Sequence, residues 1–184
     1  MTTLPTRPDQ SAKLAPSRIT IRPASPDDHD FLMEVYASTR REEMQSWGWN
    51  AAQQSGFVRL QFDARRRTYA ATFPAAAENV ILFDAVPIGS MIVAQSAGEF
   101  RLVDISILPE YRNRGIGTML ITNLIAESEQ QKLPLRLSVL RGNRAIHVYE
   151  KLGFVVTGSN EVYLELECAT AALKENPASP FPRG

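Results

Sequence analysis

The sequence contains few of the residues that build disulfide frameworks or metal centres. Its 184 residues include one cysteine, Cys168, and two histidines, His29 and His147, which lie far apart along the chain. One cysteine cannot form an internal disulfide, and these few residues cannot supply a zinc cluster. We therefore expect no bound metal, a structural role for Cys168, and a reducing, cytoplasmic location.

The sequence also has no excess charge of either sign and no long apolar run. Twenty Lys and Arg residues balance twenty Asp and Glu residues, so the formal net charge is zero. Nucleic-acid-binding proteins usually carry a strong positive field, which is absent from these totals. No apolar segment approaches the roughly 18 residues that cross a bilayer, and the N-terminus has no secretory signal pattern. We expect a protein that binds neither nucleic acid nor membrane.

Composition and length indicate one folded domain between two tails. Hydrophobic residues make up 44% of the chain and charged residues 22%, which is typical of a globular protein. Three prolines fall within residues 1–17 and three more within residues 176–184. We therefore expect flexible tails at 1–17 and 169–184, around a single domain of residues 18–168.

Periodicity predicts an α/β fold of the α+β type. Apolar or alternating segments predict strands at 18–22, 79–83, 88–94, 100–108, 135–140, 154–157 and 162–167. Helical spacing predicts helices that begin near Ser25, Asn50, Arg114 and Asn143, whereas residues 40–50 match no regular period. These elements predict a mixed, largely antiparallel central sheet of about seven strands, flanked by helices on both faces.

The most informative segment joins the predicted strand 100–108 to the next helix. It reads Arg112-Asn-Arg-Gly-Ile-Gly117, so two glycines leave the backbone N–H groups of the first helical turn unshielded, and two arginines add positive charge. This combination favours a pyrophosphate ligand, although the glycines have an alternative role in close packing of the helix on the sheet. The segment is neither a Walker loop nor a dinucleotide fingerprint, because no lysine follows Gly117 and Leu120 replaces the third glycine.

Together with a second segment, this loop resembles the GNAT superfamily of acyl-CoA-dependent N-acyltransferases. Residues 112–117 are similar to the family motif R/Q-x-x-G-x-G/A, and residues 143–154 are similar to a second hallmark in which Asn, Ala, Tyr and Gly-Phe follow in order. The resemblance implies a GNAT fold, with acetyl-CoA as cosubstrate in an opening between strands 100–108 and 135–140. The implied cofactor-binding residues are Ile105, Ser106, Ile107, Arg112, Asn113, Arg114, Gly115, Ile116, Gly117, Thr118, Asn143 and Ala145.

The resemblance also implies that Tyr149 faces the sulfur and donates a proton to the departing thiolate. Taken from the residues alone, two simpler roles stay open. Asn143 can be only a helix cap, and Tyr149 can be only a core aromatic that shares a helical face with Ala145 and Leu152.

The catalytic base is predicted among four carboxylates: Glu42, Glu43, Glu99 and Asp104. An alkylammonium has a pKa near 10.4, so a base or a lowered amine pKa is needed at neutral pH. We favour Glu43, because its segment follows the first helix and would border the acyl end. An exposed ion-pair face is the alternative for this acidic pair, and Asp104 is expected to be a solvated position on its strand.

Acceptor contacts are predicted from the same irregular segment. Trp47 and Trp49, together with Glu42, would form an aromatic and acidic wall that attracts a cationic amine. The tryptophans could equally anchor a loop or contact a second subunit, which leaves a homodimer open. The basic run 65–67 is expected to be a solvated helix face, and a contact with RNA is the alternative.

The functional expectation is an N-acetyltransferase. It would transfer an acetyl group from acetyl-CoA to a primary amine by direct attack in a ternary complex, without a covalent enzyme intermediate. The alternatives are a catalytically inactive acyl-CoA sensor and a protein-interaction module on the same fold. The expected partners are acetyl-CoA and an amine-bearing acceptor.

Overall fold

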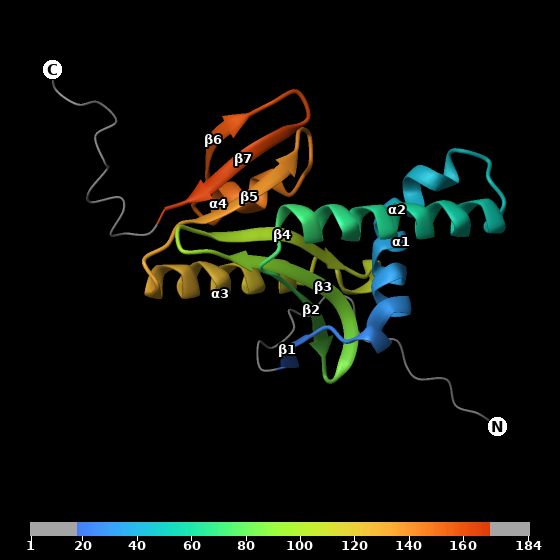
Figure 1. The fold of residues 1–184 in the computed structure, drawn as a ribbon, viewed down its shortest axis with the longest axis horizontal. Helices are drawn as coiled ribbons and strands as arrows, with labels where there is room; N and C mark the ends of the chain where they lie inside the picture. The colour runs from blue at the N-terminus through green and yellow to red at the C-terminus, as the bar shows by residue number, and fades with distance from the viewer. Residues whose placement is uncertain (1–17, 170–184) are drawn as a thin grey trace, which may run out of the picture.

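The computed structural model describes residues 18–169, so the predicted tail 1–17 and nearly all of the tail 169–184 lie outside the described residues. The described chain forms one sheet with helices packed against it (Figure 1). In chain order the elements are β1 (Ile19–Pro23), η2 (Pro26–Asp28), α1 (His29–Gln45), α2 (Ala51–Thr72), β2 (Ala76–Phe83), β3 (Val86–Gln95), β4 (Phe100–Ile107), η3 (Pro109–Tyr111), α3 (Ile116–Gln130), β5 (Leu135–Leu140), α4 (Ile146–Lys151), β6 (Val155–Ser159) and β7 (Tyr163–Cys168).

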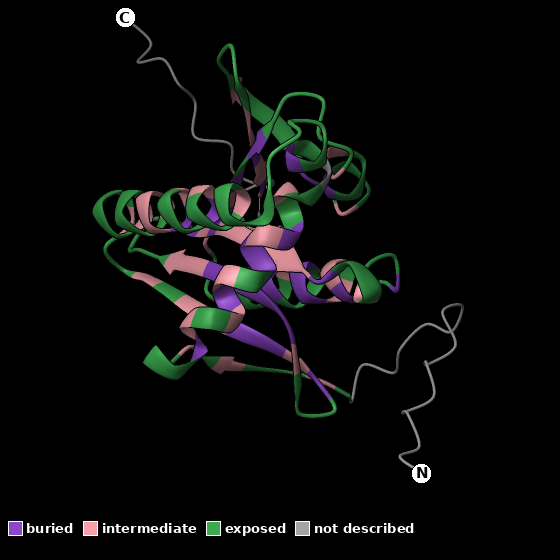
Figure 2. Cartoon of the chain, turned by 90° about the vertical axis from the view of Figure 1, so that its right-hand side faces the viewer, coloured by how far each residue is buried: buried purple, intermediate pink, exposed green. Residues whose placement is uncertain are grey.

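The sheet has seven strands in the order β1-β2-β3-β4-β5-β7-β6. Only β4 and β5 pair in parallel, and the other neighbours are antiparallel. The main apolar core lies between the sheet and the α3 and α4 side, and a smaller core joins α1 and α2 to the opposite face. Figure 2 shows buried segments in the middle of the molecule and an exposed outer side of α2. The predicted fold class is confirmed.

Local sequence signals explain how several helices begin and end. Pro26 opens the first helical turn, and the Asp28 carboxylate accepts hydrogen bonds from the backbone N–H and the hydroxyl of Ser25, at 2.7 and 2.9 Å. Asn50 caps α2 through a hydrogen bond from Gln53 N. Gly153 follows α4 with a φ of +91°, a left-handed conformation that glycine adopts without strain. All three features agree with the predicted element boundaries.

The first helix is longer than its sequence pattern predicts. Residues 40–50 were expected to be irregular, but α1 continues to Gln45. Met44, eight residues after Tyr36 on the same helical face, is also buried, so the apolar period does continue. A run of four charged residues between them, 40–43, hides the period in the sequence.

Strand β4 contains a bulge that decides which side chains face the site. Val103 has no register partner on β3, because its neighbours Leu102 and Asp104 pair with consecutive β3 residues. Leu102 before the bulge and Ile105 after it both pack in the α3-side core. The extra residue therefore keeps the apolar side chains on that face and turns Asp104 towards α2.

The two central strands separate soon after they meet. Residues 100–102 of β4 pair with residues 135–137 of β5, and the register ends there. Beyond this point the β5-facing edge of β4 has no strand partner, which is the opening expected between these strands. On its other side β4 lies very close to β3: a Cβ on Gly89 would be 2.4 Å from the backbone oxygen of Ser106. Only glycine fits there.

Candidate functional site

Two cavities meet where β4 and β5 separate. The loop cavity, about 850 Å³, lies between β4, the start of α3 and α4. The helix cavity, about 420 Å³, lies between β4, β5, α1 and α2. Both are lined by Thr39, Ile105, Ser106, Asn143 and Tyr149, so these residues mark their junction.

The loop cavity collects the predicted cofactor residues. Every residue of that set except Arg114 lines it. The segments 105–107 and 112–118 and the start of α4 are thus brought together, as the resemblance implies for one extended ligand.

The start of α3 offers backbone donors to this cavity. Gly115 has a φ of +81° and begins the helix without a side-chain cap. The first backbone hydrogen bond across this turn runs from Met119 N to Gly115 O, at 2.9 Å. The N–H groups of the preceding helical residues, 116–118, therefore have no acceptor within the helix. A Cβ on Gly117 would be 3.7 Å from the Ile107 side chain, so any larger residue would extend into the cavity. This donor set fits a pyrophosphate.

The two loop arginines act differently from one another. Arg112 lines the cavity, but its guanidinium also holds the loop in place, donating to Ile107 O at 2.7 Å and to Ser38 Oγ at 3.2 Å. Arg114 is buried, lies 5.6 Å from the centre of the Tyr111 ring, and has no hydrogen-bond partner for Nη1 among the described residues. Both leave positive charge near the exposed amides, which favours an anionic ligand.

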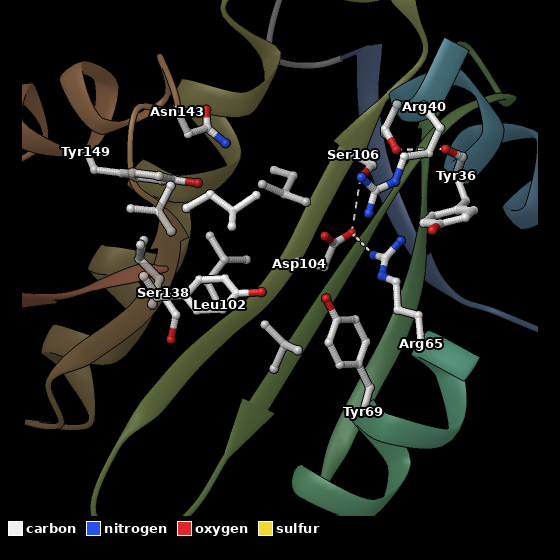
Figure 3. Close-up of a pocket in the computed structure, with 17 residues that line it drawn as sticks. Tyr36, Arg40, Arg65, Tyr69, Leu102, Asp104, Ser106, Ser138, Asn143 and Tyr149 are labelled. Atoms are coloured by element: carbon white, nitrogen blue, oxygen red, sulfur yellow. Dashed lines mark hydrogen bonds and ion pairs between the residues drawn. The ribbon is translucent and has the colours of Figure 1, made fainter. Parts of the chain in front are cut away.

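Asn143 lies at the junction and has two uses. Its Oδ1 accepts a hydrogen bond from Ala145 N at 2.9 Å, while its amide nitrogen points into the helix cavity (Figure 3). This hydrogen bond closes a turn just before α4, whose N-cap is Ala145, and it leaves the amide nitrogen available to a ligand. Asn143 precedes Ala145 by two residues rather than the three of the family pattern N-x-x-A-x-x-x-Y, so its place in the cavity, not the spacing, supports a ligand contact.

Tyr149 is both a core aromatic and a site residue. Its ring packs edge-on against Phe154, with centroids 5.7 Å apart, and only 9% of the residue is exposed. Its hydroxyl points into the helix cavity (Figure 3). Burial, together with the charge of Asp104, raises the pKa of Tyr149, so the phenol stays protonated well above neutral pH.

The opposite wall of the helix cavity is formed by two tyrosine–arginine pairs. Tyr36 and Arg40 are four residues apart on α1, and Arg65 and Tyr69 are four residues apart on α2. The Arg65 guanidinium lies 5.2 Å from the Tyr36 ring centre and 5.0 Å from that of Tyr69. These interlocked contacts fix the wall that faces Tyr149 across the cavity (Figure 3).

Asp104 lies inside this wall and is not a solvated sheet position as expected. Its Oδ2 contacts Arg65 Nη2 at 2.5 Å and accepts a hydrogen bond from Ser106 Oγ at 3.1 Å. Both side chains of the ion pair are only 20% exposed. Burial alone would lower the pKa of Arg65, but the Asp104 charge and Tyr69 outweigh it, so the net pKa is raised and the guanidinium stays charged. Arg65 is thus an exception to the solvated face predicted for 65–67.

The residues predicted for the base and the acceptor wall lie elsewhere. Glu43 is exposed, contacts Arg40 Nη1 at 3.2 Å and lines neither cavity. Trp47 and Trp49 also lie outside both cavities, and their rings pack with Phe57 at centroid distances of 5.3 Å, so they anchor the α1–α2 loop. The side chain of Glu42 is outside the described part of the structure. The catalytic role of Glu43 stays an untested prediction.

Sequence reasoning missed the helix cavity, although a signal was present. Its polar wall comes from helices that are far from the glycine loop in sequence. Each helix nevertheless carries a tyrosine and an arginine at the four-residue spacing that puts them on one face. Across residues 18–169 the structure has no group of three His, Cys, Asp or Glu side chains suited to a metal ion, nor a helix long and apolar enough to span a membrane.

Comparisons with known proteins identify a family signature and similar folds. Residues 74–156 match the family model described as acetyltransferase (GNAT) domain. A search of curated proteins found no match. Among solved structures, PaiA N-acetyltransferase from Thermoplasma acidophilum in complex with coenzyme A has a TM-score of 0.62 at 20% identity, covering 82% of this chain and 98% of that one.

Two further structures show the same fold. Histone acetyltransferase HPA2 and related acetyltransferase from Corynebacterium glutamicum has a TM-score of 0.59 at 19% identity, with coverage of 84% of this chain and 97% of that one. An acetyltransferase from Thermus thermophilus has a TM-score of 0.59 at 16% identity, with coverage of 81% and 95%. Residues 74–156 therefore carry the signature of a GNAT acetyltransferase domain, and the described residues have the fold of solved acetyltransferases.

Proposed function

We propose that this protein transfers an acetyl group from acetyl-CoA to a primary amine, with both substrates bound at once. The observation that carries the proposal is the junction of the two cavities at Ser106, Asn143 and Tyr149. A nucleotide held in the loop cavity would bring its thioester to this junction, and an acceptor in the helix cavity would meet it there. No covalent enzyme intermediate is needed.

The loop cavity supplies the donor site. The free N–H groups of 116–118 would bind the pyrophosphate, and the unpaired edge of β4 would bind the pantetheine arm as an added strand. The Asn143 amide nitrogen would donate a hydrogen bond to the same arm. When bound, acetyl-CoA supplies an activated thioester: its C–S bond breaks as the C–N bond forms. Starting from the ammonium form, nitrogen loses two protons, one to solvent by way of the base and one to the leaving sulfur.

Asp104 is the carboxylate placed to receive the amine. Both of its contacts, with Arg65 and Ser106, use Oδ2, so Oδ1 is available to the acceptor. At pH 7 an amine with a pKa near 10.4 is neutral in only about one molecule in 2,500, so binding and deprotonating the ammonium form is a real requirement. We assign this role to Asp104 rather than Glu43, because Asp104 lines the cavity.

Tyr149 would act on the leaving group from the opposite wall. Its buried hydroxyl points into the cavity and stays protonated, so it can donate a hydrogen bond as charge develops on sulfur. The amine-facing and sulfur-facing groups therefore lie on opposite sides of the junction, as direct transfer requires.

Calorimetric titration with coenzyme A tests the donor site. We expect Gly117→Glu to weaken binding by about 100-fold or more, because the side chain would fill the loop cavity and bring a like charge to the phosphates. Gly98→Glu is the matched control: Gly98 is in an exposed turn with open space around it and lines neither cavity. Normal affinity in Gly117→Glu would contradict the assignment.

Release of free thiol from acetyl-CoA, measured over a panel of amines, tests the transfer itself. Amine-dependent release supports an acetyltransferase. Binding of coenzyme A without release for any amine would favour the alternative of an acyl-CoA sensor, and absence of binding would favour a protein-interaction module.

A further inference from the structure

The charges around the helix cavity are unbalanced. Its lining contains three charged side chains, those of Arg40, Arg65 and Asp104. Arg65 and Asp104 form one ion pair, so Arg40 is the charged residue of this lining whose counter-charge, Glu43, lies outside the cavity. The neighbouring hollow does not correct this excess, because Arg101 and Glu165 are paired there at 3.3 Å. An acceptor in the helix cavity therefore meets a positive site.

Arg40 is held in place, and its ion-pair partner lies outside the cavity. Its guanidinium lies 5.7 Å from the centre of the Tyr36 ring, and a hydrogen bond with Tyr36 raises the pKa of Arg40. Glu43 contacts it at 3.2 Å from outside the cavity, with the two side chains 43% and 50% exposed. Such an exposed pair is screened by solvent and contributes little, so the guanidinium is available for a second carboxylate.

The remaining walls describe the body of the acceptor. Leu102, Val103, Leu137 and Val139 line one side of the cavity, and the rings of Tyr36, Tyr69 and Tyr163 line others. A volume of about 420 Å³ suits a small molecule with an apolar or aromatic body.

We propose that the acceptor is a small amine that also carries a carboxylate, with its ammonium group at Asp104 and its carboxylate at Arg40. This inference rests on the proposed function, since it assigns the acceptor to the helix cavity. A diamine of the same length would place a second cation beside Arg40, which disfavours it.

Matched amines test this charge preference. One set shares a benzylamine body: para-(aminomethyl)benzoate, its carboxamide, and the corresponding bis(aminomethyl)benzene. A straight-chain set contains ω-aminocarboxylates, their carboxamides and the diamines of equal length. We expect kcat/KM, followed by thiol release, to be about 10- to 100-fold higher for the carboxylates than for the carboxamides, as expected for one charge-assisted contact, and lowest for the diamines.

Arg40→Gln should remove the preference specifically. The carboxylate should lose its advantage in kcat/KM over the carboxamide, mainly through KM, while the affinity for coenzyme A should change less than about threefold. Arg41→Gln is the matched control, because Arg41 is the next residue on α1, is exposed, and lines neither cavity. It should keep the full preference.

The outcomes separate this inference from the proposed function. Equal rates for carboxylate and carboxamide, or faster reaction of the diamine, would overturn the inference and leave the acetyltransferase intact. Coenzyme A binding with neither turnover nor calorimetric binding of any aminocarboxylate would also overturn it, while the donor site stands. Failure to bind coenzyme A would overturn both.

Discussion

Replacing Tyr149 with phenylalanine isolates the contribution of one hydroxyl to transfer. The ring packing against Phe154 is kept, and no hydrogen bond of the Tyr149 hydroxyl is seen within residues 18–169. We therefore expect the free energy of unfolding to change by less than about 1 kcal/mol. The donor contacts at 116–118 and along β4 are also untouched, so the affinity for coenzyme A should hold.

The size of the kinetic effect follows from the pKa values of the two partners. Burial, together with Asp104, raises the pKa of Tyr149 above its ordinary value, whereas a thiol titrates near 8.5. Full transfer of the phenolic proton to the thiolate is therefore uphill by more than about 1.5 units, or about 2 kcal/mol. Tyr149 should act mainly as a hydrogen-bond donor to a developing charge, a contact that contributes about 1.5–3 kcal/mol and corresponds to a 10- to 100-fold loss of kcat in Tyr149→Phe.

Steady-state rates between pH 6 and 9, compared with calorimetric affinity for coenzyme A, provide the assay. The loss should be nearly constant over this range, because the raised pKa keeps the phenol protonated throughout. A loss below about threefold would remove Tyr149 from the reaction. A fall in affinity as large as the fall in rate would instead show that the hydroxyl binds the donor.

Two substitutions test the scaffold. Gly89→Ala should destabilise the protein by about 1–3 kcal/mol in urea unfolding and weaken coenzyme A binding, because its Cβ would lie 2.4 Å from Ser106 O and push β4 away. Gly98→Ala is the control, since Gly98 has open space around it. Equal stability of the two variants would refute this explanation. Asp28→Asn should destabilise the protein at pH 6, because hydrogen bonds from Arg22 and Ser25 hold the pKa of Asp28 far below its ordinary value. The stability advantage of the wild type is present above about pH 4 and should shrink as the pH falls towards 2. A difference in melting temperature that does not change with pH would contradict this prediction.

The parts of the site that are local in sequence were predictable. The glycine loop, the start of its helix and the strands on either side depend on neighbouring residues, so their sequence pattern predicts the structure. Residues 112–118, with the exception of Arg114, line one cavity, and their binding of the cofactor stays a prediction. The same logic explains the match of β5 with its predicted bounds, since alternation of buried residues is read directly from the sequence.

The helix cavity was not predictable, because it depends on contacts between distant segments. Arg65 and Asp104 are far apart along the chain and meet only when α2 packs across β4. The bulge at Val103 is equally non-local, since it is defined against β3. Trp47 and Trp49 were predicted to form a binding wall from their place beside acidic residues, whereas in the structure both rings pack against Phe57 of the next helix.

The early divergence of β4 and β5 leaves the sheet incomplete at its centre. Only three residue pairs join β4 to β5, and past them the facing edges of both strands present main-chain groups to the opening between them. A pantetheine arm bound there would lie between β4 and β5 in the position of an additional strand. The cosubstrate would thus stabilise the fold as well as react, and each release of product would remove its contribution to holding β4 and β5 together.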